Sequence, residues 1–157
     1  MRGVVVLMAA IMSATGASQA AELASKQVLT LEGANKIIAA AQTEAAHNGW
    51  PCVVAVVDDG GWLLAMQRMD AVPMLASVEL APAKARAAAA FRKPTQLLEE
   101  AINKGRTAEV TATGYTQMQG GIPVIVGGHV VGAIGVSADT PAHDQQIAEA
   151  GVRAVTP

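Results

Sequence analysis

The stretch "VVDDGGWLLAMQRMDAV" (residues 56–72) decides the fold because it contains a complete turn between two apolar runs. The first run, "CVVAVV" at residues 52–57, is rich in β-branched valine and is typical of a buried strand. The Asp-Asp-Gly-Gly turn at residues 58–61 tolerates positive φ, so residues 61–68 are expected to return as an antiparallel strand. The stretch closes with Arg-Met-Asp at residues 68–70, which strand and turn chemistry do not explain.

A second hairpin is predicted near the C-terminus, where "GGIPVIVGGHVVGAIGVSA" occupies residues 120–138. Two β-rich runs, residues 122–126 and 130–136, flank a Gly-Gly-His turn. Gly132 and Gly135 lie inside the second run, and they predict the close approach of another backbone, a bulge or a ligand.

Helical segments surround these hairpins. Residues 31–48 repeat apolar side chains at helical spacing, with Thr30 as the N-cap and Gly49 at the C-terminal stop. Residues 73–91 are dominated by alanine and are strongly helical, but Pro82 is expected to kink or break this helix.

Two further helices and a loop complete the chain. Thr95 is expected to cap a short helix that stops at Gly105, and residues 106–119 form a polar loop. Thr140 precedes Pro141 as the N-cap of a closing helix. Helices and antiparallel hairpins in this order predict an α+β or α/β/α layered domain.

The first twenty residues have the layout of a secretory signal. Arg2 precedes an apolar run at residues 3–12, and small residues follow up to Ala20. Cleavage after Ala20 would leave residues 21–157 as a single domain in the periplasm or outside the cell. The alternative is a membrane anchor, but the run has only about half of the ~20 residues that span a bilayer. We therefore expect no membrane span after cleavage.

Composition and the lack of certain sequence motifs exclude several classes of function. Acidic and basic residues are interspersed, and the net charge is −2, which argues against nucleic acid as a partner. Cys52 is the only cysteine, so an internal disulfide is impossible and a buried thiol is expected. No Ser-His-Asp order, phosphate-binding loop, dinucleotide fingerprint or zinc motif is present. A C-x-x-C-H motif is also lacking, which excludes covalent attachment of haem.

Several separated motifs together resemble one known family. Residues 56–72, then Ser77 with "KARAAAAF", then "GGIPVIVGGHVVGAIGVSADTPAHDQQIAEAG" are similar to the GlcG/HbpS-like family, which includes haem-binding HbpS proteins and the C-terminal domain of PduO-type proteins. The resemblance implies a profilin-like, three-layer α/β/α fold with a five-stranded antiparallel sheet. It also implies homo-oligomers, tetramers or octamers, and an association with haem. Ala71 and Ala138 depart from the family's glycines, and an alanine with positive φ would be strained there.

Arg68, Asp70 and Lys84 are the first candidate ligand-binding residues. Arg68 ends a strand and can clamp a carboxylate, such as a haem propionate or a small organic acid. The alternative is an ion pair with Asp70 or with a neighbouring subunit. Lys84 shares a helical face with Ser77, and it either neutralises the same anion or extends to solvent.

The polar loop supplies the other candidate ligand-binding residues. Thr113 and Tyr115 lie in it, and Tyr115 either contacts a ligand or anchors the loop. Gly120 and Gly121 allow backbone N–H groups to approach an anion. The candidate iron ligands are Tyr115, His143 and Met69. Asp144, beside His143, is placed to favour the N-terminus of the last helix.

Three functional hypotheses follow. The first is an exported, oligomeric protein that binds haem or a related tetrapyrrole non-covalently. The second is a small enzyme or accessory protein in the catabolism of an organic acid or aldehyde. The third is a structural assembly partner without a small ligand. Aromatic residues make up only 3% of the chain, so a haem pocket would be walled mainly by aliphatic side chains.

Overall fold

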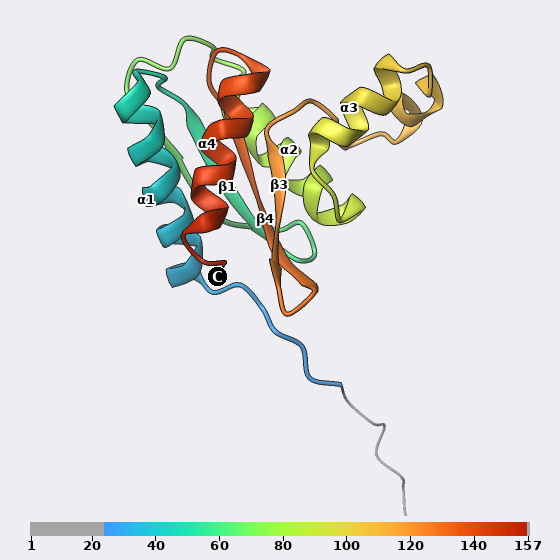
Figure 1. Ribbon diagram of the computed structural model, residues 1–157, viewed down its shortest axis with the longest axis horizontal. Coiled ribbons are helices and arrows are strands. Elements are labelled where there is room, and N and C mark those ends of the chain that lie inside the picture. The colour runs from blue at the N-terminus through green and yellow to red at the C-terminus, as the bar shows by residue number, and fades with distance from the viewer. Residues whose placement is uncertain (1–23, 157) are drawn as a thin grey trace, which may run out of the picture.

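The computed structural model describes residues 24–156, and the predicted signal segment lies outside them. The elements in chain order are α1 Leu31–Asn48, β1 Val53–Asp58, β2 Leu63–Arg68, α2 Ser77–Phe91, α3 Thr95–Asn103, the 3-10 helix η1 Thr107–Thr111, β3 Gly121–Val126, β4 His129–Ser137 and α4 Pro141–Arg153. Both predicted hairpins are present, and each joins two neighbouring antiparallel strands (Figure 1).

The sheet has the strand order β2-β1-β4-β3, and every pair of neighbours is antiparallel. The prediction of a fifth strand is wrong for the described residues, where the sheet has four strands. The segment before α1 contacts β4 without forming a strand. This segment donates one backbone hydrogen bond, from Leu29 N–H to the Val131 oxygen at 3.3 Å, and no ladder continues from that bond.

Helices cover both faces of the sheet, which gives the expected α/β/α layers (Figure 1). Val54 and Val56 of β1 belong to the core cluster that α1 and α4 close. Val53 and Ala55, on the other face, pack against Ala81 of α2. Because side chains alternate across a strand, the continuous apolar run of β1 serves both layers.

The alanine-rich sequence of α2 allows this helix to lie very close to the sheet. A Cβ atom at Gly135 of β4 would overlap the carbonyl oxygen of Ala81. The predicted close approach of a backbone at Gly135 is therefore confirmed, and the approaching backbone is that of α2.

The predicted caps of α1 and α4 are confirmed. The Thr30 side chain accepts a hydrogen bond from Gly33 N–H at 3.1 Å, and Gly49 closes α1 with φ of 71°. Thr140 caps α4 by accepting a hydrogen bond from His143 N–H at 3.2 Å.

Two local predictions differ from the structure. Of the two outcomes expected at Pro82, a break is absent, since α2 runs as one helix from Ser77 to Phe91 with Pro82 inside it. Thr95 is the first residue of α3 rather than its cap, and its hydroxyl accepts a hydrogen bond from Gly121 N–H at 2.8 Å instead. The hydroxyl thus binds a distant strand in place of its own helix.

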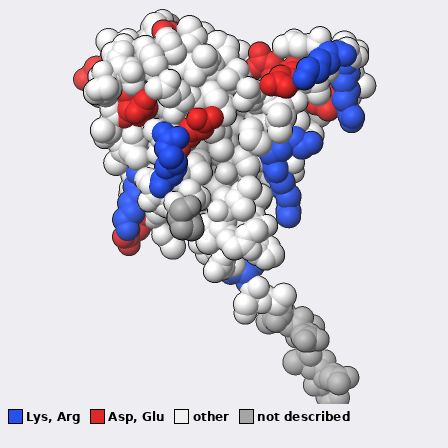
Figure 2. Space-filling view, viewed as in Figure 1, with Lys and Arg blue, Asp and Glu red and all other residues white. Residues whose placement is uncertain are grey.

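The surface of the described residues carries charges of both signs. Lys and Arg side chains alternate with Asp and Glu on the face in Figure 2, without a continuous basic stripe on that face. In the described segment, none of the helices is both long and apolar enough to cross a membrane. The chain around α3 and η1 projects sideways from the three layers (Figure 1).

Candidate functional site

Three of the four aromatic residues gather around the turn between β1 and β2. The chain has two Trp, one Tyr and one Phe. Tyr115 packs edge-on against Phe91, with ring centroids 5.3 Å apart, and the guanidinium of Arg86 lies 5.9 Å from the ring centroid of Trp62. Trp62, Arg86 and Tyr115, together with neighbouring residues, line a cleft of about 200 Å³. The lining residues are Gly60, Gly61, Trp62, Arg86, Ala90 and Tyr115.

Hydrogen bonds within the turn hold the Trp62 side of this cleft in place. The Asp58 carboxylate accepts hydrogen bonds from Gly60 N–H at 2.9 Å and from Trp62 N–H at 2.8 Å. Gly61 has φ of 84°, and a Cβ atom there would lie 3.1 Å from the Cγ atom of Arg86. The absence of that side chain lets Arg86 pack across the turn, beside the Trp62 ring. We call this site the aromatic cleft.

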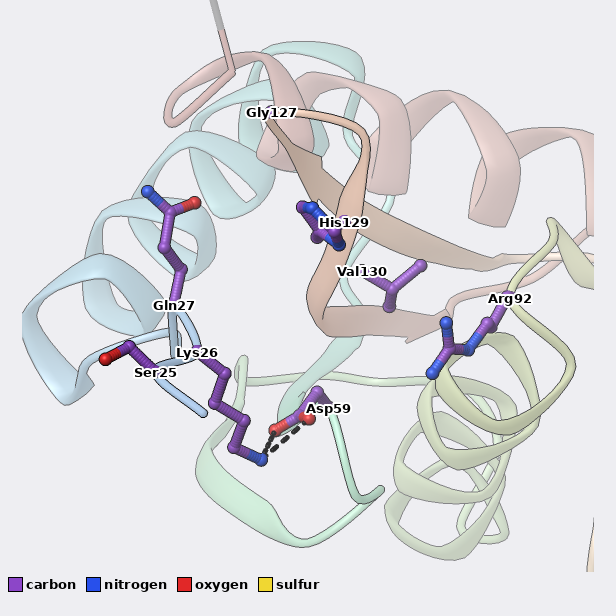
Figure 3. Close-up of a pocket in the computed structure, with 8 residues that line it drawn as sticks. All are labelled: Ser25, Lys26, Gln27, Asp59, Arg92, Gly127, His129 and Val130. Atoms are coloured by element: carbon purple, nitrogen blue, oxygen red, sulfur yellow. Dashed lines mark hydrogen bonds and ion pairs between the residues drawn. The ribbon is translucent and has the colours of Figure 1, made fainter. Parts of the chain in front are cut away.

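A larger pocket of about 490 Å³ lies at the same end of the sheet and includes Asp59 from the same turn (Figure 3). Lys26 donates hydrogen bonds to both oxygens of Asp59, at 3.1 and 2.9 Å. Arg92, at the end of α2, and His129, at the start of β4, also line the pocket. We call this site the cationic pocket, because Lys26 and Arg92 outnumber Asp59, the one acidic side chain among the described residues that line it.

Lys84, Gly120 and Gly121 come together in the interior, away from both of these sites. The Lys84 side chain is 2% exposed, which rules out the alternative that it extends to solvent. Its ammonium lies 2.6 Å from Asp144 and donates a second hydrogen bond to the Val136 oxygen at 3.1 Å. Burial raises the pKa of the Asp144 carboxyl, and the charge of Lys84 acts in the opposite direction.

The two glycines allow this packing instead of opening an anion site in the single chain. A Cβ atom at Gly120 would lie 2.7 Å from the Cβ atom of Asp144, and one at Gly121 would lie 2.5 Å from the Lys84 oxygen. The N–H group of Gly121 is already bonded to Thr95.

Arg68 and Asp70 lie at the opposite end of the sheet from the aromatic cleft. Both are exposed, and Arg68 ends the edge strand β2 opposite Val53. Within residues 24–156 neither forms an ion pair. Met69 between them turns inward, with its sulfur 3.7 Å from that of Cys52. Ala71 has φ of 58°, so the strained corner that the sequence predicted is present.

The remaining candidates divide between surface and structural contacts. Thr113 is exposed in the loop, whereas Tyr115 borders the aromatic cleft. His143 stacks on Trp50 with ring centroids 3.6 Å apart, and its Nδ1 atom lies 2.7 Å from Asp139. Bonding to His143 lowers the pKa of Asp139. In the described part of the chain, no group of three or more His, Cys, Asp or Glu side chains could hold a metal ion.

Four residues that line these two sites were not predicted from the sequence to contact a ligand. These residues are Trp62, Arg86, Arg92 and Lys26. The scarcity of aromatic residues was a usable signal for Trp62, because the chain has only one other Trp. The structure leaves the Trp62 side chain 70% exposed. The arginines gave no such signal, since their proximity to the turn depends on how α2 packs.

Comparison with known proteins places this architecture in a family. The model of a family described as "Haem degrading protein HbpS-like" matches residues 29–153. The protein GlcG of Escherichia coli K12 is 48% identical over 113 residues, which are 72% of this chain and 84% of GlcG. An uncharacterized 15.0 kDa protein of Citrobacter freundii is 36% identical over 127 residues, 77% of this chain and 87% of that protein.

Solved structures agree with this assignment. A double mutant of HbpS from Streptomyces reticuli superposes with a TM-score of 0.80 at 33% identity, over 88% of this chain and 94% of that one. The PduOC–haem complex superposes with a TM-score of 0.75 at 26% identity, over 82% and 96% of the two chains. Sequence and fold thus agree along most of the chain, which belongs to the HbpS-like family.

Proposed function

We propose that the protein binds haem or a related tetrapyrrole non-covalently at the aromatic cleft. The observation that carries this proposal is the gathering of Trp62 and Tyr115 around Arg86 in a chain with few aromatic residues. The family description and the haem complex of PduOC support it.

The side chains of the cleft fit the chemistry of such a ligand. An exposed indole offers a flat surface for stacking on a macrocycle. A guanidinium matches the geometry of a propionate carboxylate, and a tyrosine oxygen is a known ligand of haem iron. Trp62, Arg86 and Tyr115 would fill these three roles. Bound haem would supply redox and oxygen chemistry at its iron.

The cleft of one chain is too small to enclose the whole macrocycle. Its volume of about 200 Å³ lies below the roughly 300–1,000 Å³ typical of small-molecule pockets. The proposal therefore includes a homo-oligomer, a tetramer or octamer, in which a neighbouring subunit covers the rest of the ligand.

The edge strand β2 is the surface that we propose for this assembly. Leu63 and Met66 on β2 are exposed, as is Leu75 in the loop that follows. Exposed apolar side chains on an unpaired strand edge favour association. Arg68 and Asp70 lie at the end of the same strand, and we assign them to the subunit contact.

Haem titration of the purified protein tests the proposal. We expect a Soret shift on binding, weaker affinity in Trp62→Ala and Arg86→Gln, and an altered Soret band in Tyr115→Phe. Arg153→Gln is the matched control, because it removes an exposed arginine from α4. Arg68→Ala tests whether the corner on β2 contacts the ligand. A titration without a Soret shift, or one that the three cleft variants leave unchanged, would refute haem binding at this cleft.

We also propose that the mature protein is exported and begins at Ala21. The layout of residues 1–20 supports this proposal. The mass of the protein recovered from the periplasm of a Gram-negative host should correspond to residues 21–157. Recovery of the full 157-residue chain from the cytoplasm alone would contradict it.

A further inference from the structure

The cationic pocket has no part in the haem proposal, yet its lining is rich in hydrogen-bond donors. Lys26 and Arg92 contribute positive charge, His129 contributes a ring N–H, and Ser25 contributes a hydroxyl. Among residues 24–156, Asp59 is the only carboxylate that lines the pocket, and both of its oxygens already accept hydrogen bonds from Lys26. The pocket therefore has surplus donors and a surplus of positive charge.

Arg92 has an unusual backbone for an arginine. It follows the last residue of α2 with φ of 55° and ψ of 35°, in the left-handed region. Glycine is usual at this position after a helix, because any Cβ atom is strained there. The Arg92 side chain points toward the cationic pocket (Figure 3). Such strain is often found at binding sites, where the side chain is required.

The guanidinium of Arg92 is also available to a ligand. In Figure 3 the dashed bonds join Lys26 to Asp59, and none reaches Arg92 or His129. Over residues 24–156, Arg92 takes part in none of the ion pairs. An arginine without a carboxylate partner, on the wall of a donor-rich pocket, can bind an anion in a bidentate manner.

We propose that the cationic pocket binds a small organic anion through its carboxylate, with Arg92 as the principal contact. Lys26 and His129 supply further donors, and Val130 provides an apolar wall for a short carbon chain. The volume of about 490 Å³ lies within the range of small-molecule sites. This site is separate from the aromatic cleft, which is lined by a different set of residues, so the inference does not depend on haem binding.

The variant Arg92→Gly gives a sharp test because it should change binding and stability in opposite directions. Removal of the guanidinium should weaken the binding of succinate, measured by calorimetry, by about tenfold or more. The same change should raise the melting temperature, since glycine adopts the left-handed conformation without strain. Arg92→Asn, which also tolerates this conformation, should reproduce the loss of binding. Arg153→Gln on α4 is the control of equal charge and should bind succinate like the wild type.

Two further arms separate the alternatives. Inorganic phosphate should bind more weakly than succinate, and tighter binding of phosphate would overturn the assignment to carboxylates. Tyr115→Phe should leave succinate binding unchanged, and Arg92→Gly should leave the haem titration unchanged, so the two sites can fail independently. Wild-type protein that does not bind succinate, or equal affinity in Arg92→Gly, would refute the anion site.

Discussion

The ammonium of Lys84 lies 2.6 Å from the Oδ2 atom of Asp144, and both side chains are almost completely buried. The pair joins α2 to α4, two helices on opposite faces of the sheet. The other carboxylate oxygen of Asp144 accepts a hydrogen bond from Ala138 N–H. Gly120 leaves space for this contact, because a Cβ atom there would press against both partners. The pair thus connects the two helical layers.

Breaking this pair on one side should be strongly destabilising. Lys84→Met and Asp144→Asn should each lower the free energy of unfolding by about 3 kcal/mol or more, because each leaves a buried polar group without its partner. The double variant should lose clearly less than the sum of the two, as measured by urea denaturation. Lys36→Met, which breaks an exposed pair with Glu32, is the control and should have little effect. Additive losses in the double variant would show that Lys84 and Asp144 are not coupled.

Cys52 should make the protein less stable at high pH. Burial raises the pKa of its thiol to about 12, whereas an unfolded cysteine titrates near ~8.5. Between these values the unfolded chain loses a proton that the folded chain retains, so stability is full below pH ~8.5 and falls as the pH rises. Denaturation from pH 8 to 11 should show a shallower decline in Cys52→Ala than in the wild type.

The same burial should protect Cys52 from alkylation. Iodoacetamide at pH 8 should modify the thiol in urea and leave the native protein unmodified, since Cys52 is fully buried. Rapid modification of the native protein would contradict both predictions for this residue.

Ala71→Gly should stabilise the protein, against the usual effect of glycine. Ala71 has φ of 58°, a conformation that a Cβ atom disfavours. Relief of this strain exceeds the extra entropy of an unfolded glycine, so we expect a gain of up to about 1 kcal/mol in thermal or urea unfolding. Ala39→Gly, at an exposed position of α1, should instead lose about 1 kcal/mol. A loss of stability in Ala71→Gly as large as that of the control would refute this explanation.

The protein should form a homo-oligomer whose subunits associate through the β2 surface. Light scattering during gel filtration would measure its mass. Leu63→Lys and Leu75→Glu place charges on this exposed apolar surface and should shift the protein to smaller species. Leu97→Glu changes an exposed leucine on α3 and should leave the assembly intact. A monomeric wild type, or dissociation by Leu97→Glu alone, would exclude β2 as the contact.

The sequence by itself was sufficient for both hairpins and for two of the helix starts. The Asp-Asp-Gly-Gly turn and the Gly-Gly-His turn predicted both hairpins, and Thr30 and Thr140 predicted two helix starts correctly. These features depend on backbone conformations and hydrogen bonds within a few residues, which residue type controls directly. The glycines of β4 even predicted a close approach, although they did not identify α2 as the partner.

Only the tertiary structure decided which distant residues meet. Lys84 has the local sequence of a surface lysine, but packing of α2 against the sheet buries it beside Asp144, sixty residues away. The same packing brings Arg86 to the turn beside Trp62 and directs Arg92 to a pocket shared with Lys26. Such neighbours depend on helix placement and on close packing across the whole domain, which no local pattern records. The sequence therefore determined the hairpins, the capped helix starts and the family resemblance, and packing determined the two candidate sites.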